Sequence, residues 1–481
     1  MTRTMRIGRG LAVVPLAAAS LTLATPAGAI DLGTDLPANV FPDHPFPVSQ
    51  TVINEWIDKG NDSDIYAHGW TLWAGLTSDS GSTARGVENA PIYLTWATPD
   101  QLAHAPTAGE NLVARNEPLR LQPPRQFHSG HPRVTAPQAI GDARCGGSGK
   151  PDTCIVVTVN YSPSAAHHVL SNDLLAQSTL ARYVEEGYSE IPNLPYDAVT
   201  VKPVYKVISQ EKLDDNGLYA MPVWPGTPEP AKTFGEEVWN QCVHIDPNNQ
   251  GQGDGSVDQG CTGASPSTTY NLSDFIHYPV TKADQAYLQN LSGGQEGTLE
   301  VGDTIILVAM HVGSREIKRW TWQTFWWTAD PEAPNAPSSQ AMAAAQPEQL
   351  PAPASHYAMS AAYQMLAPAQ PLNDGENYGA LLPVYNPYLE AGFDPQTFKL
   401  SRPVIVPDSG LTATRYGVET NCMTCHGLAA YDPAAIYDDT GLNRETPYAA
   451  NFYLPLNDRV FDGKLKLDFA WSILGAMDQS R

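Results

Sequence analysis

Closely spaced glycine and proline residues limit the length of every helix and strand that this chain can form. Of its 481 residues, 38 are glycine and 42 are proline. Because proline cannot continue a helix and glycine favours turns, this spacing argues against a long-helix architecture. Between residues 30 and 330, short apolar segments alternate with clusters of turn residues. This pattern is typical of a β-rich sandwich or barrel with long loops.

The segments expected to form strands are rich in β-branched and aromatic residues. They span residues 70–76, 91–96, 153–159, 198–208 and 304–312. The aromatic run 320–327 (WTWQTFWW) also predicts a strand, with Trp320, Trp322 and Trp326 on one face and Phe325 and Trp327 on the other. Short helices are expected at residues 52–59, 170–186 and 281–291.

The charge balance excludes some classes of partner. Aspartate and glutamate number 51 against 28 lysines and arginines, which gives a net charge of −23. An acidic surface of this kind repels the phosphate groups of nucleic acids and the headgroups of anionic membranes. We therefore expect no nucleic-acid partner.

The N-terminus has the features of a secretory signal peptide, which we assign to residues 1–29. Arg3, Arg6 and Arg9 precede an apolar stretch at 11–24, and Ala-Gly-Ala at 27–29 fits a cleavage site. Since no two of these arginines are adjacent, a Sec-type signal is favoured over the twin-arginine type. An uncleaved anchor is the alternative. The sequence predicts export to the periplasm and no membrane span after cleavage.

Four of the six cysteines are expected to form disulfides. Cys145 and Cys154 flank a glycine-rich stretch, and Cys242 and Cys261 flank a polar loop. In an oxidising compartment, an even number of such cysteines is most simply explained by two disulfides. Pairing between near neighbours is preferred, but three connectivities are open. A zinc site is the alternative, although the paired Cys-x-x-Cys spacing that it needs is absent.

The other two cysteines form the most specific motif in the chain, Cys422-Met-Thr-Cys425-His426. Cys-x-x-Cys-His is the attachment sequence of c-type haem. Two thiols at this spacing add across two vinyl groups of the porphyrin, and the following histidine then reaches the iron. A thioredoxin-type redox pair and a third disulfide are the alternatives, and neither needs His426.

On these residues, together with Gly427, the chain resembles a c-type cytochrome. Taken as a whole, it is similar to large exported single-haem proteins of the cytochrome c family, a resemblance that implies one haem c and a compartment but no substrate. It implies a small, mainly α haem domain at 355–481. A Pro/Ala-rich linker at 331–354 would separate this domain from the β-rich region at 30–330, which holds one or two domains.

The sixth ligand of the haem iron is left open by the sequence. Met477 lies at a distance after His426 that is similar to that of the methionine ligand in small cytochromes c, but only four residues follow it. The segment 356–365 is helix-like and offers His356 and Met359 three residues apart. An iron with an open or water-bound sixth position is the remaining alternative.

The expected function is one-electron transfer in the periplasm by a single covalent haem held by Cys422, Cys425 and His426. Because the chain is acidic, a redox partner protein with a basic docking face is expected. One alternative is a haem-dependent oxidoreductase whose open iron site acts on a small molecule. A second alternative is a β-rich binding or sensor module with an accessory haem.

Overall fold

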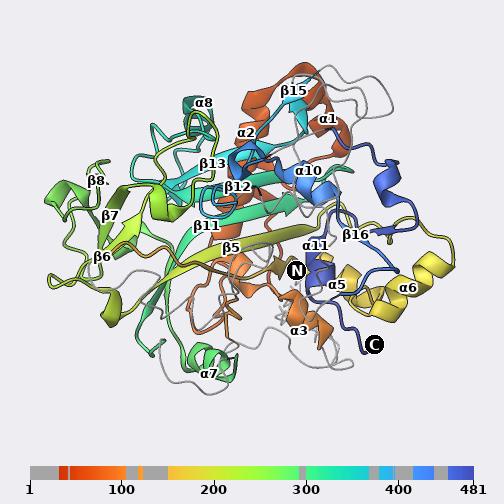
Figure 1. The fold of residues 1–481 in the computed structure, drawn as a ribbon, viewed down its shortest axis with the longest axis horizontal. Coiled ribbons are helices and arrows are strands. Elements are labelled where there is room, and N and C mark those ends of the chain that lie inside the picture. Colours follow the sequence, from red (N-terminus) through yellow and green to blue (C-terminus); the bar gives the residue numbers. More distant parts are fainter. Residues whose placement is uncertain are drawn as a thin grey trace, which may run out of the picture.

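The structure is a computed structural model, shown in Figure 1. The residues that it describes are 32–41, 44–104, 118–122, 150–291, 299–367, 379–393, 395, 415–437 and 453–481. The predicted signal peptide at 1–29 lies outside them. No helix within the described ranges is long and apolar enough to cross a membrane.

A seven-stranded antiparallel sheet forms the centre of the molecule. Its longest strand, β11 (Thr304–Ser314), pairs with β5 (Val199–Ile208) on one side and with β12 (Thr321–Trp327) on the other. The remaining strands are β13 (Tyr357–Ala362) beside β12, β3 (Val156–Val157) and β4 (Asn160–Tyr161) on β5, and β10 (His277–Pro279) on β11. Most residues of β5, β11 and β12 are buried, which explains their nearly continuous apolar sequences.

The two faces of the sheet pack against different elements. On one face, α2 (Asp62–Thr77) places Trp73 in a stack with Phe325 of β12, with ring centroids 4.5 Å apart. On the other face, Trp322 of β12 lies in a core shared with α10 (Cys422–Gly427) and α11 (Trp471–Gly475). Figure 1 shows α10 and α11 near the ends of β11 and β12.

Shorter elements surround the central sheet. The other helices are α1 (Gln50–Lys59), α3 (Pro99–Ala103), α5 (Pro163–Ser171), α6 (Gln177–Glu185), α7 (Lys282–Leu291) and α8 (Gln340–Ala344). A second sheet consists of β6 (Tyr219–Pro222), β7 (Gln241–Asp246), β8 (Asp258–Gln259) and β9 (Thr269–Asn271). Three two-stranded pairs are β1 (Asn39–Phe41) with β2 (His44–Pro45), β14 (Leu366–Ala367) with β15 (Ala380–Leu381), and β16 (Ala430–Tyr431) with β17 (Leu465–Lys466).

Several predicted elements differ from the observed ones. The segment 70–76, expected as a strand, belongs to α2, and 91–96 contains a 3₁₀ helix at Ile92–Thr95. Nearly all of the second half of α2 is buried, so it lacks the apolar–polar period that distinguishes a helix from a strand. Most of the helix expected at 356–365 is replaced by β13, because pairing with β12 overrides the helical preference of its three alanines.

The fold class is mixed, with several sheets and helices. No closed barrel occurs in the described parts of the chain, because the central sheet is open and runs from β13 to β3. β13 begins shortly after the predicted linker at 331–354, so the predicted haem domain at 355–481 shares a sheet with the region before it. The mainly α, cytochrome c-like fold expected there is not confirmed. The described residues of 355–481 contain the strands β13 to β17 and two short α-helices, α10 and α11.

The disulfide predicted between Cys242 and Cys261 is confirmed, and it closes the polar loop between β7 and the end of β8. Cys154 is also disulfide-bonded. Its predicted partner, Cys145, lies outside the described residues, so that pairing stays a prediction.

Replacing both Cys242 and Cys261 by serine should lower the free energy of unfolding by about 3 kcal/mol. The disulfide closes a loop of 19 residues, and its loss releases the corresponding entropy to the unfolded chain. Urea denaturation under oxidising conditions measures the difference between the two proteins. In a reducing buffer the stabilities should converge. A difference below about 1 kcal/mol in the oxidising buffer would contradict a stabilising role.

Candidate functional site

The Cys-x-x-Cys-His motif forms the short helix α10, and Asn421 begins it. The side-chain oxygen of Asn421 accepts a hydrogen bond from the backbone N–H of Thr424, at 3.1 Å. Its amide nitrogen donates to the carbonyl oxygens of Leu382, at 2.7 Å, and Gln364, at 3.3 Å. Because the Asn421 side chain is fully buried, these bonds anchor α10 to the segments that follow β13 and β15.

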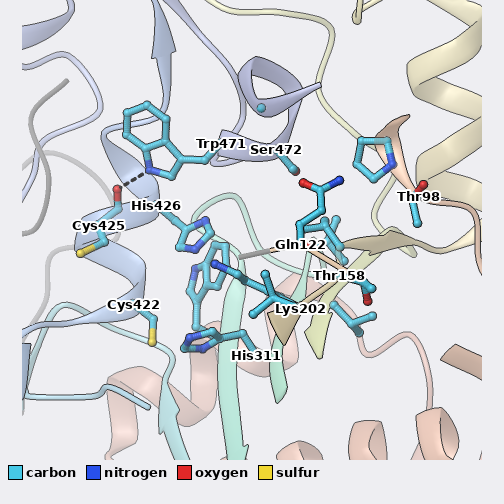
Figure 2. Close-up of a pocket in the computed structure, with 18 of the residues that line it drawn as sticks. Thr98, Gln122, Thr158, Lys202, His311, Cys422, Cys425, His426, Trp471 and Ser472 are labelled. Carbon is cyan, nitrogen blue, oxygen red and sulfur yellow. Dashed lines mark hydrogen bonds between the residues drawn. The ribbon is translucent and has the colours of Figure 1, made fainter. Parts of the chain in front are cut away.

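One side of α10 carries all three residues of the motif. Residues three and four positions apart in a helix lie on the same side, which applies to Cys422, Cys425 and His426. All three line one cavity of about 230 Å³. Figure 2 shows the imidazole of His426 extending from α10 towards the strands, whereas the sulfur atom of Cys425 points away from this imidazole in the same view. A ligand bound in this cavity could therefore contact all three residues.

The imidazole of His426 is held in one orientation. Nδ1 lies 3.0 Å from the carbonyl oxygen of Phe469, and since a carbonyl only accepts, Nδ1 carries the proton. Burial lowers the pKa of His426 to about 4, so the ring is neutral at pH 7. Nε2 has no hydrogen-bond partner among the described residues and keeps its lone pair. The ring of Trp322 packs beside this imidazole, with centroids 4.0 Å apart.

The two thiols of the motif are not joined to each other. The Cys422 thiol donates a hydrogen bond to the carbonyl oxygen of Val384, at 3.2 Å. Burial, followed by the charge of Glu390, raises the pKa of this thiol well above its usual value, so it is protonated. The backbone carbonyl of Cys425 accepts a bond from the indole N–H of Trp471, at 2.9 Å, and this bond ties α10 to α11 (Figure 2).

Strands from the region before residue 330 form the opposite wall of the cavity. Lys202 of β5, His311 and Gly313 of β11, and Trp322 of β12 line it. At one end of the cavity, polar side chains of Thr98, Gln122 and Thr158 also line it (Figure 2). The described residues contain no cluster of three or more His, Cys, Asp or Glu side chains arranged to hold a metal ion.

His311 was not singled out from the sequence. Its Nε2 lies 3.1 Å from Oε1 of Glu390, and the other oxygen of Glu390 accepts a bond from the backbone N–H of Asn386, at 2.7 Å. Burial opposes ionisation of Glu390, but His311 and the Asn386 N–H outweigh it, so the pKa of Glu390 is lowered. The only feature of the sequence that could have indicated His311 is its position as a single histidine within the apolar segment 304–312.

A strained turn positions the carbonyl group to which His426 donates. Asp468 and Phe469 have φ angles of 45° and 68°, a left-handed conformation that is uncommon for residues other than glycine. The Asp468 carboxylate accepts hydrogen bonds from Arg315 Nε, at 2.9 Å, from the Leu194 N–H, at 2.8 Å, and from Trp320 Nε1, at 3.3 Å. These buried bonds offset a strain of about 1–3 kcal/mol per residue.

The other predicted ligand candidates lie away from the cavity. Met359 packs against Gly69 of α2, on the opposite face of the sheet from Trp322. His356 lies near Asp274, whose charge acts on it. Met477 is buried after the end of α11 and does not line the cavity. The structure thus brings together Cys422, Cys425 and His426, but none of these three candidates joins them.

No protein-family model, curated protein or solved structure matches this chain at a significant level. The function is therefore inferred from the residues of the site.

Replacing Asp468 by alanine should lower the free energy of unfolding by about 3–5 kcal/mol, because Arg315 would be left as a buried, unpaired charge. Asp468→Asn, which keeps one acceptor oxygen, should cost less. Asp462→Ala serves as the control, since Asp462 is exposed in the same segment and its loss should change stability by less than about 0.5 kcal/mol. Urea denaturation measures all three. Equal stabilities for Asp468→Ala and Asp462→Ala would show that the carboxylate does not hold the turn.

Proposed function

We propose that this chain is an exported single-haem c-type cytochrome that transfers single electrons in the periplasm. The observation that carries the proposal is the geometry of α10. Cys422, Cys425 and His426, whose imidazole is held in one orientation, all line the same cavity. A disulfide at the same spacing would need no oriented histidine.

The residues of the cavity fit a covalently attached haem. No disulfide joins Cys422 to Cys425, as thioether formation requires. His426 donates from Nδ1 to a backbone carbonyl, which is how metal-binding histidines are commonly held so that the other nitrogen can bind. The cavity volume of about 230 Å³ is below the roughly 300–1,000 Å³ of typical ligand sites, so we expect a porphyrin to extend beyond it.

Each residue of the motif then has a defined task. Cys422 and Cys425 hold the haem through thioether bonds, and Nε2 of His426 binds the iron. The haem supplies a ferric–ferrous couple that accepts and releases one electron. The hydrogen bond to Phe469 keeps the imidazole in the tautomer that can bind iron, and Trp322 restricts its rotation.

The proposed compartment is supported by the disulfide between Cys242 and Cys261, since disulfides persist mainly outside the cytoplasm. This agrees with the signal peptide predicted at 1–29. The net charge of −23 favours a redox partner with a basic docking face.

A second candidate is a haem-dependent oxidoreductase that acts on a small molecule at an open iron site. The polar side chains of Thr98, Gln122 and Thr158 at one end of the cavity favour it, because they could bind such a molecule. Carbon monoxide distinguishes the two functions. It binds an open ferrous iron readily and does not displace two strong protein ligands.

Haem attachment should depend on both cysteines when the chain is produced in a host that matures c-type cytochromes. The double variant Cys422→Ala/Cys425→Ala should retain no haem after denaturation. Each single variant should keep one thioether, and its absorption in alkaline pyridine should shift to longer wavelength because one vinyl group stays conjugated with the ring.

Met423→Leu is the matched control for this experiment. Met423 lies between the two cysteines, but it is buried in the protein core and does not line the cavity. This variant should retain its haem with an unchanged pyridine spectrum. Haem retained covalently by the double cysteine variant would contradict the proposed attachment.

A further inference from the structure

A second ligand for the proposed haem iron can be sought among the side chains that share the cavity with His426. Of the described residues that line it, His311 is the one other histidine, and none is a methionine. His311 lies in the middle of β11, directly opposite Lys202 of β5 in the register of the sheet. Figure 2 shows the side chains of Lys202 and His311 on one side of the cavity.

The packing of Trp322 places His311 close to His426. Trp322 pairs with Gly313, and a Cβ atom at Gly313 would come within 2.9 Å of the indole ring, so glycine allows the ring to lie against β11. The same ring contacts the imidazole of His426. Residues two apart in a strand lie on the same face, so the side chain of His311 lies on the same face of β11 as Gly313.

The orientation of His311 leaves one nitrogen available to bind a metal. Glu390 is ionised and can only accept, so Nε2 of His311 donates the proton in their 3.1 Å contact. In the neutral form of the ring, Nδ1 then carries the lone pair, and it has no hydrogen-bond partner among the described residues. A histidine held by a carboxylate in this way is a common arrangement for metal ligands.

We propose that Nδ1 of His311 would supply a second protein ligand to the iron held by His426. This inference rests on the proposed function and replaces Met477, Met359 and His356 as candidates. Two imidazole ligands leave the iron without an open position, which suits electron transfer and not small-molecule catalysis. The ligand would come from β11, so the large region before residue 330 would form half of the iron site.

The test compares the purified holoprotein with His311→Ala by visible absorption, electron paramagnetic resonance and carbon monoxide titration. The wild type should be six-coordinate, low-spin and unreactive towards carbon monoxide. His311→Ala should become high-spin and bind carbon monoxide, and added imidazole should restore the low-spin spectrum. His277→Ala, at an exposed histidine of β10 in the same sheet, is the matched control and should resemble the wild type.

A second variant keeps the inference testable if His311→Ala does not fold. His311→Met should produce a sulfur-to-iron charge-transfer band that the wild type lacks. A wild type that binds carbon monoxide, a His311→Ala protein that stays low-spin and unreactive, or a folded His311→Met protein without the new band would each overturn the assignment. Failure of the proposed function is distinct from these results, because the denatured wild type would then carry no covalent haem.

Discussion

The hydrogen bond between Nδ1 of His426 and the carbonyl oxygen of Phe469 links the motif helix to the C-terminal segment. It fixes the tautomer and direction of the imidazole. The turn that offers this carbonyl has left-handed backbone angles at two residues, and the buried carboxylate of Asp468 holds it through Arg315 and Trp320. Arg315 and Trp320 lie in the connection between β11 and β12. The orientation of one ring therefore depends on contacts between distant parts of the chain.

This dependence explains why a motif of five residues is embedded in a chain of 481. Helix α10 has six residues and cannot enclose a cofactor alone. β5, β11 and β12 supply the opposite wall of the cavity. Trp322 packs against the imidazole, and His311 is part of the same wall. In the proposed cytochrome, the large first part of the chain thus completes the haem site and need not be a separate functional module.

The sequence predicts the strands β5, β11 and β12 well, because long runs of β-branched and aromatic residues suit a sheet buried on both faces. It mispredicts α2, since a helix buried on all sides has the same apolar sequence as a buried strand. Within the site, Cys422, Cys425 and His426 are recognisable because the proposed haem attachment requires a fixed spacing. His311 is not recognisable, because its place in the lining of the same cavity follows from the packing of β11 against β12.

The intact mass of the denatured protein, secreted from a host that matures c-type cytochromes, shows whether a haem is covalently attached. A single-haem c-type cytochrome should give one species, heavier than the polypeptide by one haem. A mass that corresponds to the polypeptide alone would contradict it. Two disulfides lower the mass of the polypeptide by four hydrogens. A haem-free mass lower by six hydrogens would indicate a third disulfide, between Cys422 and Cys425, and the motif would then be a redox or structural cysteine pair.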